Sequence, residues 1–140
     1  TTIDFDERYV QIAHETFAMS GLADRISIRQ GMAAEVLQQM VEEHQQGQLD
    51  TYDFIFIDAD KENNPLYLEY CLQLSHSGTI IVADNVVRDG KLITETDKAP
   101  NIRGLRQYYQ DLASNPALDS TAFQTVSTKG WDGLCITLVK

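Results

Sequence analysis

The stretch YDFIFIDADKENN, residues 52–64, carries the pattern that decides the fold. Five of the seven residues from Tyr52 to Asp58 are apolar or aromatic, and a nearly continuous apolar run of this kind predicts a strand buried on both faces of a parallel sheet. The run ends in Asp58, Asp60 and Lys61. Because a half-buried carboxylate needs a partner such as a cation, a metal ion or helix amide groups, the surrounding sequence must supply one for Asp58.

Strand and helix patterns alternate on both sides of this stretch. Strands are expected at residues 1–5, 25–31 and 78–87, and helices at residues 7–21, 33–47 and 66–75. Asp6 is a suitable N-cap for the first helix, Gly21 a suitable C-terminal residue, and Pro65 suits the first turn of the third. Alternating strands and helices predict right-handed parallel crossovers and an α/β sheet covered by helices on both faces.

The last third of the chain has a different pattern. A polar loop is expected at residues 89–101 and a helix at residues 102–116, where Arg103 and Arg106 are expected on a half-exposed face rather than in an anion site. Two runs with period-two alternation follow in residues 122–140, on either side of KGWDG. This alternation predicts an antiparallel strand pair that closes the sheet.

Composition limits the class of protein. A chain of 140 residues with 43% hydrophobic residues forms one domain, and no apolar run approaches the roughly 20 residues that cross a bilayer. A net charge of −10 argues against nucleic acid as a partner and favours a small molecule. Cys71 and Cys135 lie in apolar patterns without paired spacing. These features predict a cytoplasmic protein with reduced thiols and no membrane contact.

Polar residues follow the predicted strands at their carboxyl ends, where ligands bind in open parallel sheets. Asp4 ends the first strand, and an acidic residue there is placed to accept the ribose hydroxyls of an adenosine-type ligand. The pattern alone favours a helix cap or a turn at this position. Asp58, Asp84 and Asn85 together offer the hard oxygen ligands that Mg²⁺ or Ca²⁺ requires. Helix capping by Asp58 and Asp60, and an Asx-type turn at Asp84, are an equally good interpretation of the spacing.

Lys61 follows Asp58 by three residues. A divalent cation beside a lysine disfavours the ammonium form, so this lysine could remove a proton from a hydroxyl group as a general base. Taken alone, a lysine in this position is more often a solvated surface charge.

These motifs resemble the cation-dependent class I O-methyltransferases, a family that includes the catechol and caffeoyl-CoA enzymes and small bacterial relatives. The resemblance rests on TTIDFD (1–6), RISIRQGMAAEVL (25–37), YDFIFIDADKENN (52–64), SGTIIVADNVVRDGKL (77–92) and KGWDGLCITLV (129–139). It implies a single methyltransferase domain over residues 1–140. The implied fold is a Rossmann-like, doubly wound and mostly parallel sheet with an antiparallel C-terminal strand pair.

The resemblance also implies a donor site for S-adenosylmethionine. Asp4 matches the acidic residue that holds the ribose, and Phe5 lies beside the adenine. Ala33 falls where the family places an adenine contact, and only its backbone could serve here. Asp58 is shared between the donor site and the metal site.

For the reaction, the resemblance implies that Asp58, Asp84 and Asn85 bind Mg²⁺, Ca²⁺ or Mn²⁺ and that Lys61 is the catalytic base. The acceptor would be a catechol-like small molecule with two adjacent hydroxyls, and the loop bearing Trp131 and Asp132 would border it. A homodimer is expected for the full-length protein.

The chain departs from the family pattern at its N-terminus. It begins inside a strand pattern without an initiator methionine, so it is expected to be a truncated form that lacks the family's N-terminal helices, first strand and glycine-rich loop. That strand lies between the strands at residues 1–5 and 52–57, and its loss would leave two interior edges unpaired. The truncated chain is therefore expected to bind the donor feebly or not at all.

Two other functions fit parts of the pattern. A phosphorylatable receiver also gathers carboxylates, Mg²⁺ and a lysine at strand ends, but its lysine lies on a strand distant from the acceptor aspartate rather than three residues after it. A degenerate methyltransferase could keep the fold as a noncatalytic binding module. Phosphotransfer labelling would reveal the first, and saturable donor binding without turnover would mark the second.

Overall fold

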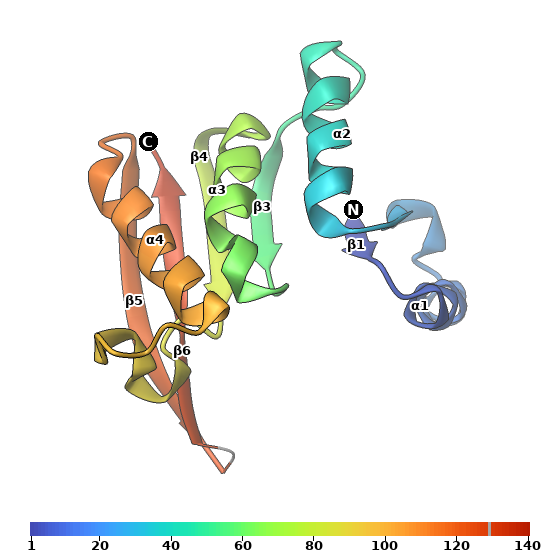
Figure 1. Cartoon of the computed structure of the whole chain (residues 1–140). Helices are drawn as coiled ribbons and strands as arrows, with labels where there is room; N and C mark the ends of the chain where they lie inside the picture. The colour runs from blue at the N-terminus through green and yellow to red at the C-terminus, as the bar shows by residue number, and fades with distance from the viewer. Residues whose placement is uncertain (129) are drawn as a thin grey trace.

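The computed structural model describes residues 1–128 and 130–140. Its strands are β1 (Thr2–Asp4), β2 (Ile28–Gln30), β3 (Tyr52–Ile57), β4 (Ser75–Asp84), β5 (Leu118–Ser127) and β6 (Gly130–Val139). Its α-helices are α1 (Glu7–Ser20), α2 (Ala33–Gln45), α3 (Asn64–Gln73) and α4 (Pro100–Ser114). Three 3₁₀ segments connect them, at η1 (Ala23–Arg25), η2 (Lys61–Asn63) and η3 (Arg88–Ile93). The expected order of strands and helices is confirmed, and Figure 1 shows it along the chain.

Local sequence signals set the ends of several helices. The Asp6 side chain accepts a hydrogen bond from the Arg8 amide at the start of α1, and Gly21 ends this helix with a left-handed φ of 70°. Pro65 lies in the first turn of α3. The strand expected at residues 25–31 is shorter than predicted. Since β2 pairs only with the three-residue β1, the length of its partner limits its own ladder.

The strands form two sheets. β1 pairs with β2 in parallel, and the other four strands follow the order β3-β4-β6-β5. Within the larger sheet, β3 and β4 are parallel, whereas β6 is antiparallel to both β4 and β5. The antiparallel C-terminal pair predicted from the sequence is confirmed. Residue 129, the first of the KGWDG segment between the two runs, lies outside the described residues.

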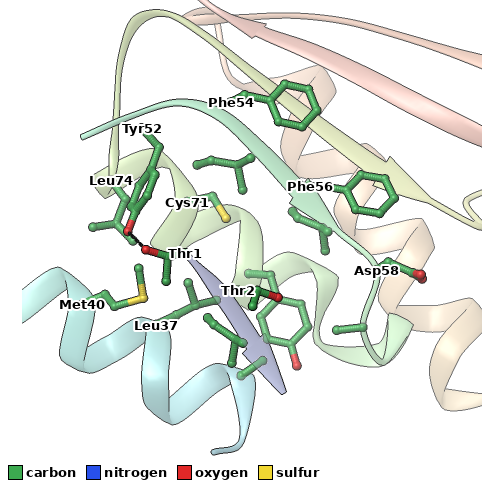
Figure 2. Close-up of a pocket in the computed structure, with 16 residues that line it drawn as sticks. Thr1, Thr2, Leu37, Met40, Tyr52, Phe54, Phe56, Asp58, Cys71 and Leu74 are labelled. Atoms are coloured by element: carbon green, nitrogen blue, oxygen red, sulfur yellow. Dashed lines mark hydrogen bonds between the residues drawn. The ribbon is translucent and has the colours of Figure 1, made fainter. Parts of the chain in front are cut away.

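β1 and β3 face each other without pairing. A cavity of about 440 Å³ separates them, and Figure 2 shows Thr2 of β1 on one side and Phe54 and Phe56 of β3 on the other. The Tyr52 hydroxyl donates a hydrogen bond to Thr1 Oγ1 at 3.0 Å across one end of this cavity. Two unpaired strand edges therefore lie at the position where the family resemblance places a further strand.

The two faces of the larger sheet differ. Helices α3 and α4 cover one face (Figure 1), where Tyr67, Leu105 and Tyr108 pack in a core cluster with buried sheet residues such as Ile81 and Cys135. On the other face Phe54 and Phe56 are 59% and 55% exposed. Within the part of the chain that the structure describes, helices therefore cover one face of this four-stranded sheet, and the other face is exposed at β3.

Both cysteines are buried free thiols, and burial raises the pKa of Cys71 to about 12. Among the described residues no helix combines the length and apolar character that a membrane span requires.

Candidate active site

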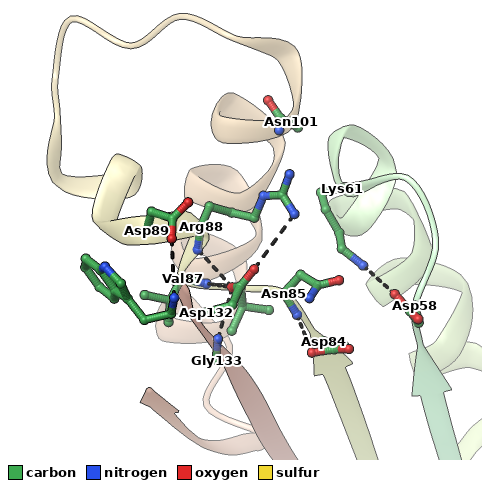
Figure 3. Close-up of polar contacts among 12 residues, drawn as sticks. Asp58, Lys61, Asp84, Asn85, Val87, Arg88, Asp89, Asn101, Asp132 and Gly133 are labelled. Atoms are coloured by element: carbon green, nitrogen blue, oxygen red, sulfur yellow. Dashed lines mark hydrogen bonds and ion pairs between the residues drawn. The ribbon is translucent and has the colours of Figure 1, made fainter. Parts of the chain in front are cut away.

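The carboxyl ends of β3 and β4 bring three predicted site residues together. Because Ile57 is paired with Ala83, Asp58 and Asp84 are the next residues on two adjacent parallel strands. Adjacent strands lie about 4.8 Å apart. Figure 3 shows Asp58, Asp84 and Asn85 at this same edge of the sheet. The spacing in the sequence did predict this placement, because parallel strands end at one edge.

These three side chains fit the oxygen ligands that a hard divalent cation prefers. The backbone amide of Asn85 donates a hydrogen bond to Asp84 Oδ1 at 2.6 Å. One contact of the Asx-type turn that the sequence also allowed is therefore present. Within the described residues, the side-chain amide of Asn85 makes no hydrogen bond. No three His, Cys, Asp or Glu side chains of the described chain cluster for metal binding, whereas Asp58, Asp84 and Asn85 supply two carboxylates and one amide.

Lys61 is the partner of Asp58. Its Nζ donates a hydrogen bond to Asp58 Oδ1 at 3.0 Å, and its side chain is only 7% exposed, whereas that of Asp58 is 53% exposed. The alternative of a solvated surface lysine is therefore wrong. Asp58 does not cap the following helix, and Asp60 instead accepts hydrogen bonds from the side chains of Asn63 and Tyr67. The Lys61 ammonium group thus reaches the same edge of the sheet as the three oxygen side chains.

Gly104 of α4 lets the segment that carries Lys61 approach the helix closely. A Cβ atom at Gly104 would lie 2.5 Å from Glu62 Cα and 2.5 Å from the Lys61 carbonyl oxygen. Both are backbone atoms, which cannot rotate away. Any side chain here must therefore move η2 and, with it, Lys61.

We expect Gly104→Ala to lower the free energy of unfolding by about 1–3 kcal/mol, because overpacking against backbone outweighs the better helix propensity of alanine. Urea unfolding of the chain measures this. Gln110→Ala, at an exposed position of the same helix, is the matched control and should leave the unfolding midpoint nearly unchanged. A stabilised Gly104→Ala variant would show that η2 is not held against α4 as described.

A second cavity, of about 350 Å³, opens beside Asp84 and Asn85. Trp131 lines it and packs against Gly90, since a Cβ atom at Gly90 would lie 2.6 Å from Trp131 Cη2. The structure thus places Trp131 beside the predicted metal-binding residues, as expected for a residue that borders an acceptor.

Asp132 lines the same cavity and also accepts hydrogen bonds from the backbone beside it. Its Oδ1 accepts hydrogen bonds from the backbone amides of Val87 and Arg88, both at 2.9 Å, and from that of Gly133 at 3.0 Å (Figure 3). Nearby, the Tyr109 hydroxyl donates to the Val86 carbonyl at 3.2 Å. Burial raises the pKa of Tyr109 to about 12, so it stays a donor at neutral pH. Hydrogen bonds with residues of β6 and α4 therefore hold the backbone that follows Asn85.

Arg106 was not identified as a site-forming residue from the sequence. Its guanidinium donates hydrogen bonds to the backbone carbonyls of Lys91, Leu92, Thr94 and Asp97. It thereby ties η3 and the loop after it to α4, and its partners are carbonyl groups rather than an anion. No local pattern marks these contacts, because they join residues 9 to 15 positions apart through the fold.

The predicted donor-site residues are only partly brought together. Ala33, at the start of α2, and Asp58 both line the cavity between β1 and β3. Asp4 lies at the end of β1, and its Oδ1 accepts a hydrogen bond from the Asp6 amide at 2.9 Å, which is the turn-forming alternative. Phe5 is 69% exposed. Asp4 and Phe5 lie outside the set of residues that line this cavity.

An α/β sheet with polar side chains gathered beyond its strand ends is the architecture of small-molecule-binding α/β proteins. Residues 1–137 match the family model for O-methyltransferase. The chain is 39% identical over 139 residues to a catechol O-methyltransferase of Niastella koreensis and 35% identical over 139 residues to one of Mycobacterium tuberculosis. These alignments cover 99% of this chain and 61% and 60% of those relatives.

Solved structures agree. An O-methyltransferase from Bacillus cereus in complex with SAH has a TM-score of 0.91 and 41% identity, over 99% of this chain and 61% of that one. The O-methyltransferase TomG from Streptomyces achromogenes, in complex with SAM, has a TM-score of 0.92 and 29% identity, over 99% and 60% of the two chains. The chain therefore belongs to the O-methyltransferase family, and it spans about 60% of the length of these relatives.

Proposed function

We propose that this protein transfers a methyl group from S-adenosylmethionine to a hydroxyl of a catechol-like small molecule, with the help of a divalent cation. The observation that carries this proposal is the meeting of Asp58, Lys61, Asp84 and Asn85 at one edge of the sheet. The names of the two bacterial relatives support a catechol acceptor, and the SAH and SAM complexes support the donor.

Asp58, Asp84 and Asn85 would hold Mg²⁺, Ca²⁺ or Mn²⁺. When bound, such a cation supplies Lewis-acid chemistry that lowers the pKa of an acceptor hydroxyl and orients it. The donor would lie against Asp4, Phe5 and Ala33, with Asp58 near both ligands. In this arrangement Asp4 accepts from the ribose hydroxyls, and the exposed ring of Phe5 lies beside the adenine.

Lys61 is the proposed base. Its nitrogen is held beside Asp58 at the edge of the sheet, within reach of a hydroxyl placed near Asp84 and Asn85. The ammonium form of Lys61 would be disfavoured beside a cation bound at Asp58, and the neutral amine would then take the hydroxyl proton as the oxygen lone pair attacks the methyl carbon of the donor. The carbon–sulfur bond breaks, and its electron pair stays on sulfur, which leaves S-adenosylhomocysteine. Much of the acceleration comes from positioning, because the sulfonium methyl is already activated.

A methyl-transfer assay tests this proposal. Full-length protein is incubated with isotopically labelled S-adenosylmethionine and a panel of catechols, with Mg²⁺ or with a chelator. We expect monomethylated catechols in the presence of Mg²⁺, little product with the chelator, and no transfer to matched monophenols. Saturable donor binding without turnover would instead indicate a noncatalytic binding module, and transfer that is insensitive to the chelator would contradict the role of the cation.

A further inference from the structure

Arg88 occupies a position beside the candidate active site that the proposed reaction does not use. It is the first residue of η3 and lines the 350 Å³ cavity together with Asp84 and Asn85. Figure 3 shows its guanidinium above Asn85, between Asn101 and Lys61. The positively charged side chain of Arg88 therefore lies next to the residues proposed to bind the metal and the acceptor.

The guanidinium of Arg88 has unused donors. In the described part of the chain it makes one polar contact, from Nη1 to Asp132 Oδ2 at 3.8 Å, which is too long for a hydrogen bond. Its side chain is 37% exposed. Arg106 differs, because its guanidinium donates to four backbone carbonyls. Arg88 therefore keeps its planar fork of N–H groups for a ligand, and this fork matches the two oxygens of a carboxylate.

The backbone holds Arg88 in a conformation that is unfavourable for most residues. Arg88 and Asp89 have φ angles of 52° and 53°, in the left-handed region. Residues with this backbone strain persist where the surroundings enforce it, often at ligand sites. Here the Asp132 carboxylate enforces it by accepting a hydrogen bond from the Arg88 amide at 2.9 Å. Asp132 thus holds the backbone at Arg88, a residue that lines the cavity.

Three carboxylates and two cations line the cavity, namely Asp84, Asp89 and Asp132 against Arg88 and Lys91. Asp132 uses Oδ1 for three backbone amides, and the Trp131 amide donates to Asp89 Oδ1 at 3.5 Å. Lys91 is exposed and also lines the cavity. Trp131, packed on Gly90, adds a flat apolar surface against which an aromatic ring can lie.

We propose that Arg88 selects acceptors whose aromatic ring carries a carboxylate as well as two adjacent hydroxyls. This inference rests on the proposed function. The hydroxyls would lie toward Asp84 and Asn85, the ring against Trp131, and the carboxylate against the fork of Arg88 with Lys91 nearby. Neutral and cationic catechols would lack this last contact.

Steady-state methyl transfer by the full-length protein tests the assignment with 3,4-dihydroxybenzoate and its neutral amide, 3,4-dihydroxybenzamide. We expect kcat/KM to be about tenfold higher for the carboxylate, since a charge-assisted pair that is partly exposed contributes modestly. Arg88→Gln should remove this preference by raising KM for the carboxylate only. Arg88→Lys should keep part of it, because the charge remains without the fork.

Lys98→Gln, in an exposed part of the loop before α4, is the control and should change neither acceptor. Equal kcat/KM for the two acceptors in the unmodified protein would overturn the role of Arg88 while leaving the proposed function intact. An equal loss for both acceptors in Arg88→Gln would show a structural role instead. If neither acceptor is methylated but another catechol of the panel is, this assignment fails and the proposed function stands, whereas both fail if no catechol is methylated.

Discussion

Replacing Asp84 with asparagine is expected to lower Mg²⁺-dependent methyl transfer by about a thousandfold, because a bound cation contributes several kcal/mol of charge stabilisation and each 1.36 kcal/mol corresponds to tenfold in rate. Asparagine keeps the side-chain oxygen that accepts from the Asn85 amide, so the turn after β4 is preserved. What is lost is one negative charge at the end of that strand. The measurement is the initial rate at fixed catechol concentration over a range of Mg²⁺ concentrations.

The Mg²⁺ dependence separates a lost cation site from a misfolded protein. High Mg²⁺ should restore part of the rate of Asp84→Asn, since the variant keeps oxygen atoms at the site. Asp119→Asn, at an exposed position of β5, removes the same charge elsewhere and should leave the rate and its Mg²⁺ dependence unchanged. An Asp84→Asn variant with the original rate and the original Mg²⁺ requirement would remove Asp84 from the cation site.

Lys61→Met is expected to lower kcat by about 10²–10⁴-fold, the usual contribution of a positioned general base, with little change in donor affinity. Methionine keeps an unbranched side chain of similar length in the buried position of Lys61, whereas alanine would also leave a cavity. Single-turnover rates report the chemical step, and calorimetric titration with S-adenosylmethionine reports donor affinity.

Lys98→Met provides the matched control on an exposed lysine and should retain the rate. A Lys61→Met variant that transfers methyl groups at the unmodified rate would mean that another group, or water, takes the proton. A variant that loses donor binding together with the rate would give Lys61 a structural role in the donor site.

The parts of the fold that follow from short-range signals could be predicted from the sequence. The caps at Asp6 and Gly21 and the turn at Pro65 depend on neighbouring residues only, and all three are present. The meeting of Asp58 with Asp84 was also predictable, because parallel strands place their carboxyl ends at one edge of a sheet. For these residues, the local sequence signals and the parallel order of the strands are sufficient for the prediction.

Contacts between side chains and distant backbone could not be predicted. Asp132 accepts a hydrogen bond from the Val87 amide across 45 positions, and Arg106 donates to carbonyls of η3 and of the loop after it. No local sequence pattern around an aspartate or an arginine indicates such a distant backbone partner. The burial of Lys61 depends in the same way on the absence of a side chain at Gly104, a contact that only the packing of α4 against η2 reveals.

Asp4 is a residue for which the local sequence did not decide between two roles. Its sequence position allowed both a ribose contact and a local turn, and the structure shows the turn, through the hydrogen bond from the Asp6 amide. One carboxylate oxygen makes that bond, and the other is left for a ligand. The ribose contact therefore remains part of the proposed function.

Anomalous diffraction from crystals of the full-length protein soaked with Mn²⁺ tests the cation site formed by Asp58, Asp84 and Asn85 most directly. We expect one strong anomalous peak at the ends of β3 and β4, with oxygen atoms of these three side chains at about 2.0–2.6 Å. The peak should be much weaker in Asp84→Asn crystals soaked in the same way. A map without a peak at this edge, at a Mn²⁺ concentration that supports full turnover, or a peak bound by other residues, would contradict the account.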